Sequence, residues 1–159
     1  MRLLSLALFL AIALLACSSL ARAADPTPAA SGSPALDAVV TNTRDDKGRV
    51  GCSLFNDRDP SAFPRDSKKK FRHVWAPIHN GQAVCEFAGI PAGTYAVVVF
   101  QDEDMTGDMR SNMLGMPQEG YGFSNNPRVR FSAPSFSDAS FKYNGQSQKV
   151  SIVLQYWSP

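Results

Sequence analysis

Apolar residues alternate with polar ones in short runs over most of the chain after residue 35. In residues 49–55 (RVGCSLF), Val50, Cys52 and Leu54 occupy every second position, which places them on one face of a β-strand. No apolar pattern of helical period extends over ten residues in this part of the chain. The pattern therefore predicts an all-β domain whose strands comprise residues 36–41, 49–55, 71–78, 82–87, 94–100 and 149–157.

Turn residues between these runs predict how the strands connect. Residues 45–48 (DDKG) and 79–81 (HNG) predict two hairpins, one between the first two strands and one between the third and fourth. Residues 128–131 predict a further short strand, and residues 136–141 an element of undefined type. We expect a single antiparallel β-sandwich of about seven strands, immunoglobulin- or transthyretin-like, with one long loop.

That long loop covers residues 102–126, directly after the nearly continuous apolar run 94–100 (TYAVVVF). A loop of about 25 residues inside a compact domain is uncommon unless it is functional or internally braced. We therefore expect the loop to carry the function of the domain or to be tied down by its own contacts.

The first part of the loop, QDEDMTGDMRSN in residues 101–112, carries oxygen-bearing side chains at alternate positions, and Gly107 permits a sharp bend. Calcium takes about six to eight oxygen ligands. The spacing predicts a calcium site with the candidate ligands Asp102, Asp104, Thr106, Asp108, Asn112 and Glu119. Against this, Met113 stands where an EF-hand would supply its bidentate Glu, so the alternative is an acidic surface turn without metal.

The second part of the loop, GMPQEGYGFSNN in residues 115–126, interleaves glycines with aromatic residues. Such a segment offers a stacking platform for a ligand such as a sugar, with the candidate residues Tyr121, Phe123, Asn125 and Asn126. In that case the chain is a carbohydrate- or cell-envelope-binding module, with envelope polysaccharide or another exported protein as partner. The alternative is that the rings pack over the end of a sheet and the Asn side chains bond to backbone.

The N-terminus has the order of a secretory signal peptide, so we expect an exported protein, periplasmic or extracellular. Arg2 is followed by an apolar stretch and then by small residues before a cleavage site after Ala23, which makes residues 1–23 the signal peptide. Cys17 ends a lipobox-like sequence (LLAC), so the alternative is a lipoprotein anchored through that cysteine. Residues 24–35 read as a flexible tether, and residues 36–159 as the β-sandwich domain.

Removal of Arg2 and Arg22 with the signal peptide leaves 14 of the 16 basic residues against 14 acidic ones. This balance does not favour a nucleic-acid partner. Cys52 and Cys85 remain as an even pair in an oxidising compartment, which predicts a disulfide. A zinc site of these thiols with His73 and His79 is the alternative, but the close-paired spacings of such sites are missing.

Motifs of catalysis are missing from the sequence, and we expect a protein that is not an enzyme. Neither His73 nor His79 stands in a motif with a Ser or Cys nucleophile, and no phosphate-binding loop occurs. A carboxylate pair such as Asp104 and Glu119 could support hydrolysis only at a defined separation, which the sequence does not provide.

The stretch FAGIPAGTYAVVVFQDEDMTGDMRSNMLGMPQEGYGFSNN, with APSFSDASF after it, resembles the exported bacterial family called domain of unknown function 2141, over roughly residues 39–156. The residues that carry the resemblance are Phe87, Pro91, Gly93, Tyr95, Asp102, Asp104, Gly107, Asn112, the segment 115–126, Pro134, Phe136 and Ala139. The resemblance implies an exported β-sandwich without an assigned role.

Three positions of the loop depart from the family pattern: Gln101 stands where His is common, Thr106 replaces Asn, and Arg110 replaces the second Asp. Arg110 brings a cation of its own, which we expect to pair with Asp102 or Asp104 in place of a metal.

Overall fold

Alternating apolar and polar residues form eight strands in the part of the chain that the computed structural model describes, residues 33–129 and 132–157. In β4, for example, Ala83, Cys85 and Phe87 are buried and the residues between them are exposed. All six strand predictions are confirmed within a few residues. In chain order the elements are β1 (Ala35–Thr41), β2 (Arg49–Asn56), the 3-10 helix η1 (Pro60–Ala62), β3 (Arg72–Pro77), β4 (Gln82–Ala88), β5 (Gly93–Asp102), β6 (Tyr121–Phe123), α1 (Phe136–Ala139), β7 (Phe141–Tyr143) and β8 (Gln148–Val153).

The predicted signal peptide, Cys17 and the tether up to residue 32 lie outside the described residues. Within the described ranges, no helix is long and apolar enough to cross a membrane.

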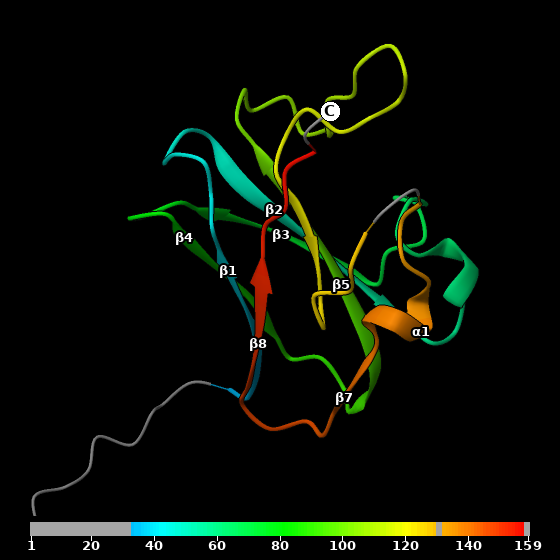
Figure 1. The fold of residues 1–159 in the computed structure, drawn as a ribbon. Coiled ribbons are helices and arrows are strands. Elements are labelled where there is room, and N and C mark those ends of the chain that lie inside the picture. The colour runs from blue at the N-terminus through cyan, green and yellow to red at the C-terminus, as the bar shows by residue number, and fades with distance from the viewer. Residues whose placement is uncertain (1–32, 130–131, 158–159) are drawn as a thin grey trace, which may run out of the picture. The chain divides into compact units, whose positions relative to one another are not determined.

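The strands form two open sheets that pack together, an arrangement consistent with a β-sandwich (Figure 1). One sheet has the order β4-β1-β8 and the other β3-β2-β5-β6, with β7 also pairing with β5. Both predicted hairpins are wrong, because β1 and β2 lie in different sheets, and so do β3 and β4. Turn residues fix a reversal of the chain, but in a two-layer domain a reversal can also carry the chain from one sheet to the other.

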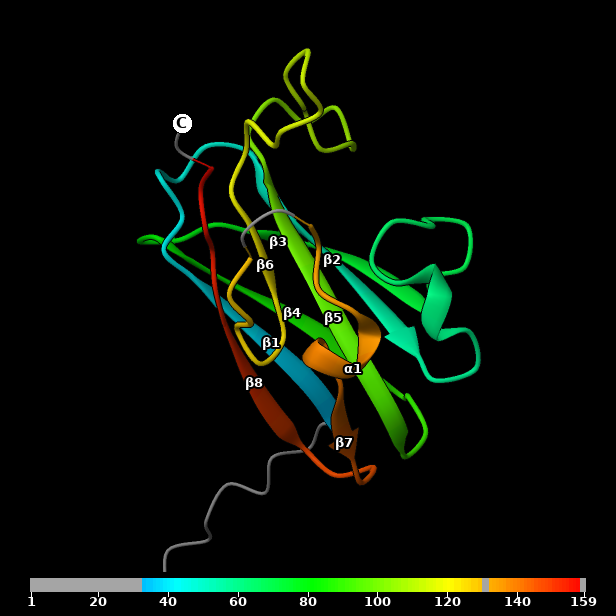
Figure 2. The same ribbon diagram turned by 45° about the vertical axis from the view of Figure 1, so that its right-hand side comes forward.

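The prediction of a purely antiparallel fold is wrong for one pair of strands. β1 and β8 run parallel, with Leu36 opposite Gln148 and Thr41 opposite Val153, and the two lie side by side in Figure 2. Every other strand pair is antiparallel. Alternation along a strand says which face is buried but carries no information about the direction of its neighbour.

The space between the sheets is filled by one apolar cluster, in which Leu36, Val50, Val97 and Ile152 are fully buried. The predicted disulfide between Cys52 of β2 and Cys85 of β4 joins one sheet to the other through this core. Because both sulfur atoms are bonded to each other, the zinc alternative has lost its two thiolate ligands.

A second apolar cluster lies on the outer face of the five-stranded sheet, where η1 and α1 cover part of β2 and β5 (Figure 2). A capping box of Ser135 and Asp138 starts α1. The element predicted over residues 136–141 is thus α1 followed by β7. Arg128 and Val129 belong to no strand, and the rest of the strand predicted over 128–131 lies outside the described residues. The buried members of the cluster are Phe55, Ala62, Phe63, Ala96, Phe123, Phe136 and Ala139.

Candidate functional site

The predicted loop 102–126 contains the short strand β6 (Tyr121–Phe123), so the loop itself runs from residue 103 to residue 120, and its two ends meet at one end of the five-stranded sheet. Asp102 is the last residue of β5, and Glu119 stands two residues before β6. Because β5 and β6 are antiparallel neighbours, the chain leaves and re-enters the sheet at the same place, and Gln101 N donates to Gly120 O over 2.8 Å. Both acidic side chains are fully buried at this junction. The topology therefore brings together two carboxylates that are far apart in sequence.

Arg49, the cross-strand neighbour of Asp102 on β2, neutralises this buried carboxylate. Arg49 Nε donates to Asp102 Oδ2 over 3.0 Å, and Gly107 N donates to the same oxygen over 3.1 Å. Asp102 Oδ1 is buried and has no hydrogen-bond partner among the described residues. A buried carboxylate oxygen without a partner is costly, which marks this atom as a place for a further ligand.

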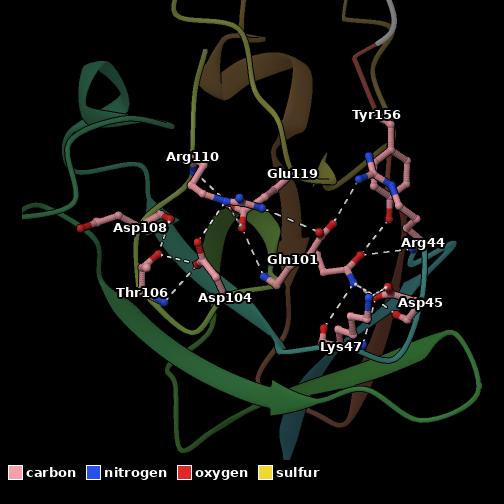
Figure 3. A network of polar contacts seen from close by, with 11 residues as sticks. Arg44, Asp45, Lys47, Gln101, Asp104, Thr106, Asp108, Arg110, Glu119 and Tyr156 are labelled. Carbon is pink, nitrogen blue, oxygen red and sulfur yellow. Dashed lines mark hydrogen bonds and ion pairs between the residues drawn. The ribbon is translucent and has the colours of Figure 1, made fainter. Parts of the chain in front are cut away.

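Glu119 acts as an acceptor for the loop backbone. Its Oε2 accepts from Arg110 N over 2.9 Å, and its Oε1 accepts from Glu103 N over 3.2 Å. The Arg110 side chain returns to the same group and donates from Nε to Oε1 over 3.2 Å (Figure 3). Glu119, which stands just before β6, therefore ties the part of the loop that leaves β5, at residues 103 and 110, to the part that returns to the sheet.

Asp104 lies on the other side of the Arg110 guanidinium, with Nε and Oδ2 3.1 Å apart (Figure 3). Thr106 donates to Asp104 Oδ1 from its hydroxyl over 2.8 Å and from its backbone N over 3.3 Å. The hydroxyl bond, with smaller contributions from the backbone bond and from Arg110, lowers the pKa of Asp104. Glu119, in turn, raises the pKa of Arg110 above its ordinary value.

Asp102, Asp104 and Glu119 form the one group of metal-binding character among the described residues, since one ligand atom from each lies within 4.8 Å of the others. All three were predicted calcium ligands. Hard carboxylate oxygens at this separation suit calcium chemically, although Arg110 now lies between Asp104 and Glu119.

The other three predicted ligands do not join this group. Thr106 contacts it only by donating to Asp104. Asp108 is exposed, and its backbone oxygen accepts from the Thr106 hydroxyl over 3.3 Å. Asn112 Oδ1 accepts from the backbone nitrogens of Leu114 and Met116 and so shapes the turn at the loop tip.

Arg110 pairs with Asp104, one of its two expected partners, whereas Asp102 pairs with Arg49. Arg49 was not among the predicted site residues, because the sequence marks it only as the first residue of a strand. The signal lies in the pairing of β2 with β5, which places Arg49 opposite Asp102 and cannot be read from either strand alone.

Gln101 lies fully buried beside the site. Its Oε1 accepts from Tyr156 Oη over 2.9 Å and from Arg44 N over 3.2 Å. Its Nε2 donates to Asp45 Oδ1 over 3.1 Å and to Asp45 O over 3.2 Å (Figure 3). The amide therefore links β5 to the β1–β2 connection and to the end of the described chain.

Three of the four predicted platform residues are engaged within the fold, and the fourth, Tyr121, is partly exposed. Phe123 is only 5% exposed and belongs to the outer apolar cluster. Asn125 donates to Ser140 O over 2.8 Å, and Asn126 bonds to the backbone of β8, so both amides are engaged within the fold. Tyr121 alone is half-buried, with a pKa that burial raises.

The family model described as "Uncharacterized protein conserved in bacteria (DUF2141)" matches residues 38–151. No curated protein and no solved structure shows a significant match to the chain.

Proposed function

The chain belongs to this family of uncharacterized bacterial proteins, and we propose that its domain is a binding module with a calcium site at the base of the β5–β6 loop. The observation that carries this proposal is Asp102 Oδ1, a buried oxygen without a hydrogen-bond partner among the described residues. Asp104 and Glu119 offer ligand atoms within 4.8 Å of Asp102. These three carboxylates would hold the ion. The ion would then stabilise the loop in place of the contacts that Arg110 makes with Asp104 and Glu119.

Arg110 and calcium compete for the same carboxylates in this proposal. The Arg110 side chain is 44% exposed, so it can move into solvent at modest cost when an ion arrives. Without the ion, Arg110 neutralises Asp104 and Glu119 and keeps the loop closed. Removal of Arg110 should therefore weaken the metal-free protein and strengthen its response to calcium.

Thermal unfolding of the mature, oxidised protein in excess chelator and in millimolar calcium tests the proposal. A ligand that binds only the native state raises Tm with its concentration. We expect calcium to raise Tm by several degrees, Asp104→Ala to abolish the rise, and Arg110→Ala to enlarge it. Asp108→Ala is the matched control, because Asp108 lies on the same loop but outside the carboxylate group. No shift in either the wild type or Arg110→Ala would assign the loop a purely structural role.

We also propose a non-enzymatic role, because the carboxylates that could serve hydrolysis, Asp104 and Glu119, are both engaged by Arg110. An assay against polysaccharide and ester substrates tests this part, and turnover that Glu119→Gln abolishes would contradict it.

Export to the periplasm or beyond is proposed from the predicted signal peptide and is supported by the Cys52–Cys85 disulfide. The intact mass of the mature protein decides between cleavage after Ala23 and a lipid on Cys17. The immunoglobulin- or transthyretin-like type of the two-sheet domain likewise stays a prediction, which a solved structure would test.

A further inference from the structure

Positive charge is concentrated in the connection between β2 and β3. Residues 57–72, which we call the basic segment, hold six basic and three acidic residues, which leaves a charge of +3. All the other described residues together hold seven basic and ten acidic residues, which leaves a charge of −3. The positive charge of the basic segment is therefore a local feature and not part of a general excess over the domain.

Lys69 neutralises two of the three acids inside the basic segment. Its Nζ lies 2.8 Å from Asp59 Oδ2 and 4.0 Å from Asp66 Oδ2. The third acid, Asp57, is exposed and forms no ion pair with a described residue. Five cations of the segment likewise form no ion pair with any described residue; they are Arg58, Arg65, Lys68, Lys70 and Arg72. Four of these five side chains are exposed and Lys70 is half-buried, so solvent reaches all of them.

The backbone of the basic segment is fixed by the fold. Asp66 N donates to Ala62 O over 2.9 Å, and Lys69 N donates to Asp66 O over 3.0 Å. At the end of the segment, Phe71 N donates to Leu54 O of β2 over 2.8 Å. Because these bonds tie the segment to itself and to the sheet, its cations are presented together on one ordered surface.

The acids of the long loop lie at the other end of the five-stranded sheet. The basic segment begins after Asn56, the last residue of β2, whereas the loop begins beside Arg49, the first. These two residues are about 23 Å apart along the strand. Figure 1 accordingly shows the segment beside α1 and the long loop at the top of the molecule. Since charges are screened over about 8 Å at physiological salt, Asp104 and Asp108 do not offset the cations of the segment.

Acids of the neighbouring elements do not neutralise the basic segment either. α1 contacts η1, and its one acidic residue, Asp138, accepts from Ser135 Oγ over 2.6 Å and from Ser135 N over 3.0 Å. Asp37 and Glu86 pair across β1 and β4, on the face of the three-stranded sheet that points away from the core. The positive charge therefore remains open to a partner outside the chain.

The basic segment offers this charge without an aromatic surface. Its two aromatic residues pack inward, Phe63 in the outer apolar cluster and Phe71 against the core between the sheets. Sugars and nucleobases are commonly held by stacking on exposed rings, which the segment does not provide. A membrane surface rich in anionic phospholipids needs only cations close to its phosphate groups. Charge complementarity without stacking therefore favours a lipid surface.

From this separation of charge we propose that the basic segment is a docking surface for membranes that contain anionic phospholipids. The five cations without ion pairs would lie against the headgroup phosphates, and the binding would be peripheral and sensitive to salt. The same membrane would repel the acidic loop at the other end of the sheet. The domain would thus be oriented with its candidate calcium group away from the lipid, and the docking does not depend on calcium.

Cosedimentation with lipid vesicles, in excess chelator, tests the proposal on the mature protein of residues 24–159. We expect binding to vesicles of about one third phosphatidylglycerol in phosphatidylcholine to be at least about tenfold stronger than binding to phosphatidylcholine alone. A rise from about 0.05 M to about 0.5 M salt should release the protein. The double variant Lys68→Gln/Lys70→Gln should bind the anionic vesicles about tenfold more weakly.

The matched control is the double variant Lys47→Gln/Lys149→Gln, which removes the same charge from two exposed lysines outside the basic segment. It should bind within about twofold of the parent, and thermal unfolding verifies that both double variants are folded. Equal binding to the two kinds of vesicle, or an equal loss in the two double variants, would overturn the proposal.

Two other occupants of the basic segment are separated by further measurements. If soluble polygalacturonate, at equal anionic charge, released the protein from the vesicles, the segment would belong to an acidic polysaccharide. If sedimentation showed self-association that Lys68→Gln/Lys70→Gln abolished, the segment would belong to the acidic loop of a second copy. Either result would overturn the proposal, whereas a monomer that stays on the vesicles would support it.

Discussion

Tyr156 donates its phenolic hydrogen to Gln101 Oε1 over 2.9 Å, which joins the end of the described chain to the strand that leads into the candidate site. The Tyr156 ring also packs against Gly120, where a Cβ would lie 2.6 Å from the ring. The base of the loop is therefore held by contacts from a segment that follows it by more than thirty residues.

Replacement of Gln101 by Leu should destabilise the domain more than replacement of Tyr156 by Phe. Tyr156→Phe removes one hydrogen bond at a cost of about 1 kcal/mol in the free energy of unfolding. Gln101→Leu also removes the partners of Arg44 N and Asp45, for a cost of roughly 2 to 3 kcal/mol. Urea unfolding monitored by circular dichroism measures both values. Equal losses of stability in the two variants would mean that water satisfies Arg44 N and Asp45 when the Gln101 amide is absent.

Glu119→Ala should cost roughly 2 to 4 kcal/mol, because it leaves the Arg110 and Glu103 backbone nitrogens without their acceptor. Glu119→Gln keeps an oxygen in place and should cost less. The matched control is Glu86→Ala at an exposed position of β4, which should change the free energy of unfolding by less than about 0.5 kcal/mol. Chemical denaturation in chelator measures all three, and a Glu119→Ala value near that of Glu86→Ala would contradict the bracing role.

Reduction of the disulfide should lower the free energy of unfolding by about 3 to 4 kcal/mol, since Cys52 and Cys85 are 33 residues apart in sequence and the bond restricts the unfolded chain. The double variant Cys52→Ala/Cys85→Ala should show the same loss with or without reductant. Urea unfolding with and without reductant measures the loss. If reductant left the urea midpoint of the parent protein unchanged, the disulfide would contribute nothing to stability.

The domain should lose stability as the pH falls below about 6.5, the ordinary pKa of His. The folded protein lowers the pKa of His73, chiefly through burial, so the unfolded chain takes up a proton first and is favoured as the pH drops toward the folded value. Above the unfolded pKa both states are neutral and His73 contributes no pH dependence. Urea midpoints between pH 8 and pH 5 should fall less for His73→Gln than for the parent.

His79→Gln is the control for that series, because His79 lies at an exposed turn. It should retain the parent's pH profile. A His73→Gln profile that coincides with the parent's would assign the acid sensitivity to other groups.

Strand positions could be predicted because alternation is a local property, as in Ala83, Cys85 and Phe87 of β4. The layer of each strand could not be predicted in this way. The turn at 79–81 looks like a hairpin and even forms the bridge between His79 and Gln82, yet β3 and β4 enter different sheets. Which sheet a strand joins depends on the whole set of apolar faces, and no single turn carries that information.

The residues of the candidate site that lie on the loop could be predicted from the sequence, but those that lie on the sheet could not. Alternating acids pointed to Asp102 and Asp104, and Glu119 was a candidate from the far end of the same loop. Arg49 comes from a strand 53 residues away from Asp102 and enters through the β2–β5 register. The burial of Asp102 and Glu119 likewise follows from strand ends that meet only in the folded domain.

The parallel pairing of β1 with β8 determines how the domain would bear a pulling force. If tension acts on residues 33 and 157, it draws β1 and β8 along their lengths in opposite directions. Because the two strands are in register from Leu36 with Gln148 to Thr41 with Val153, their mutual hydrogen bonds are loaded in shear and share the force. An antiparallel terminal pair would open one bond at a time, like a zipper. The arrangement suits a domain that stays folded while it is held at both ends.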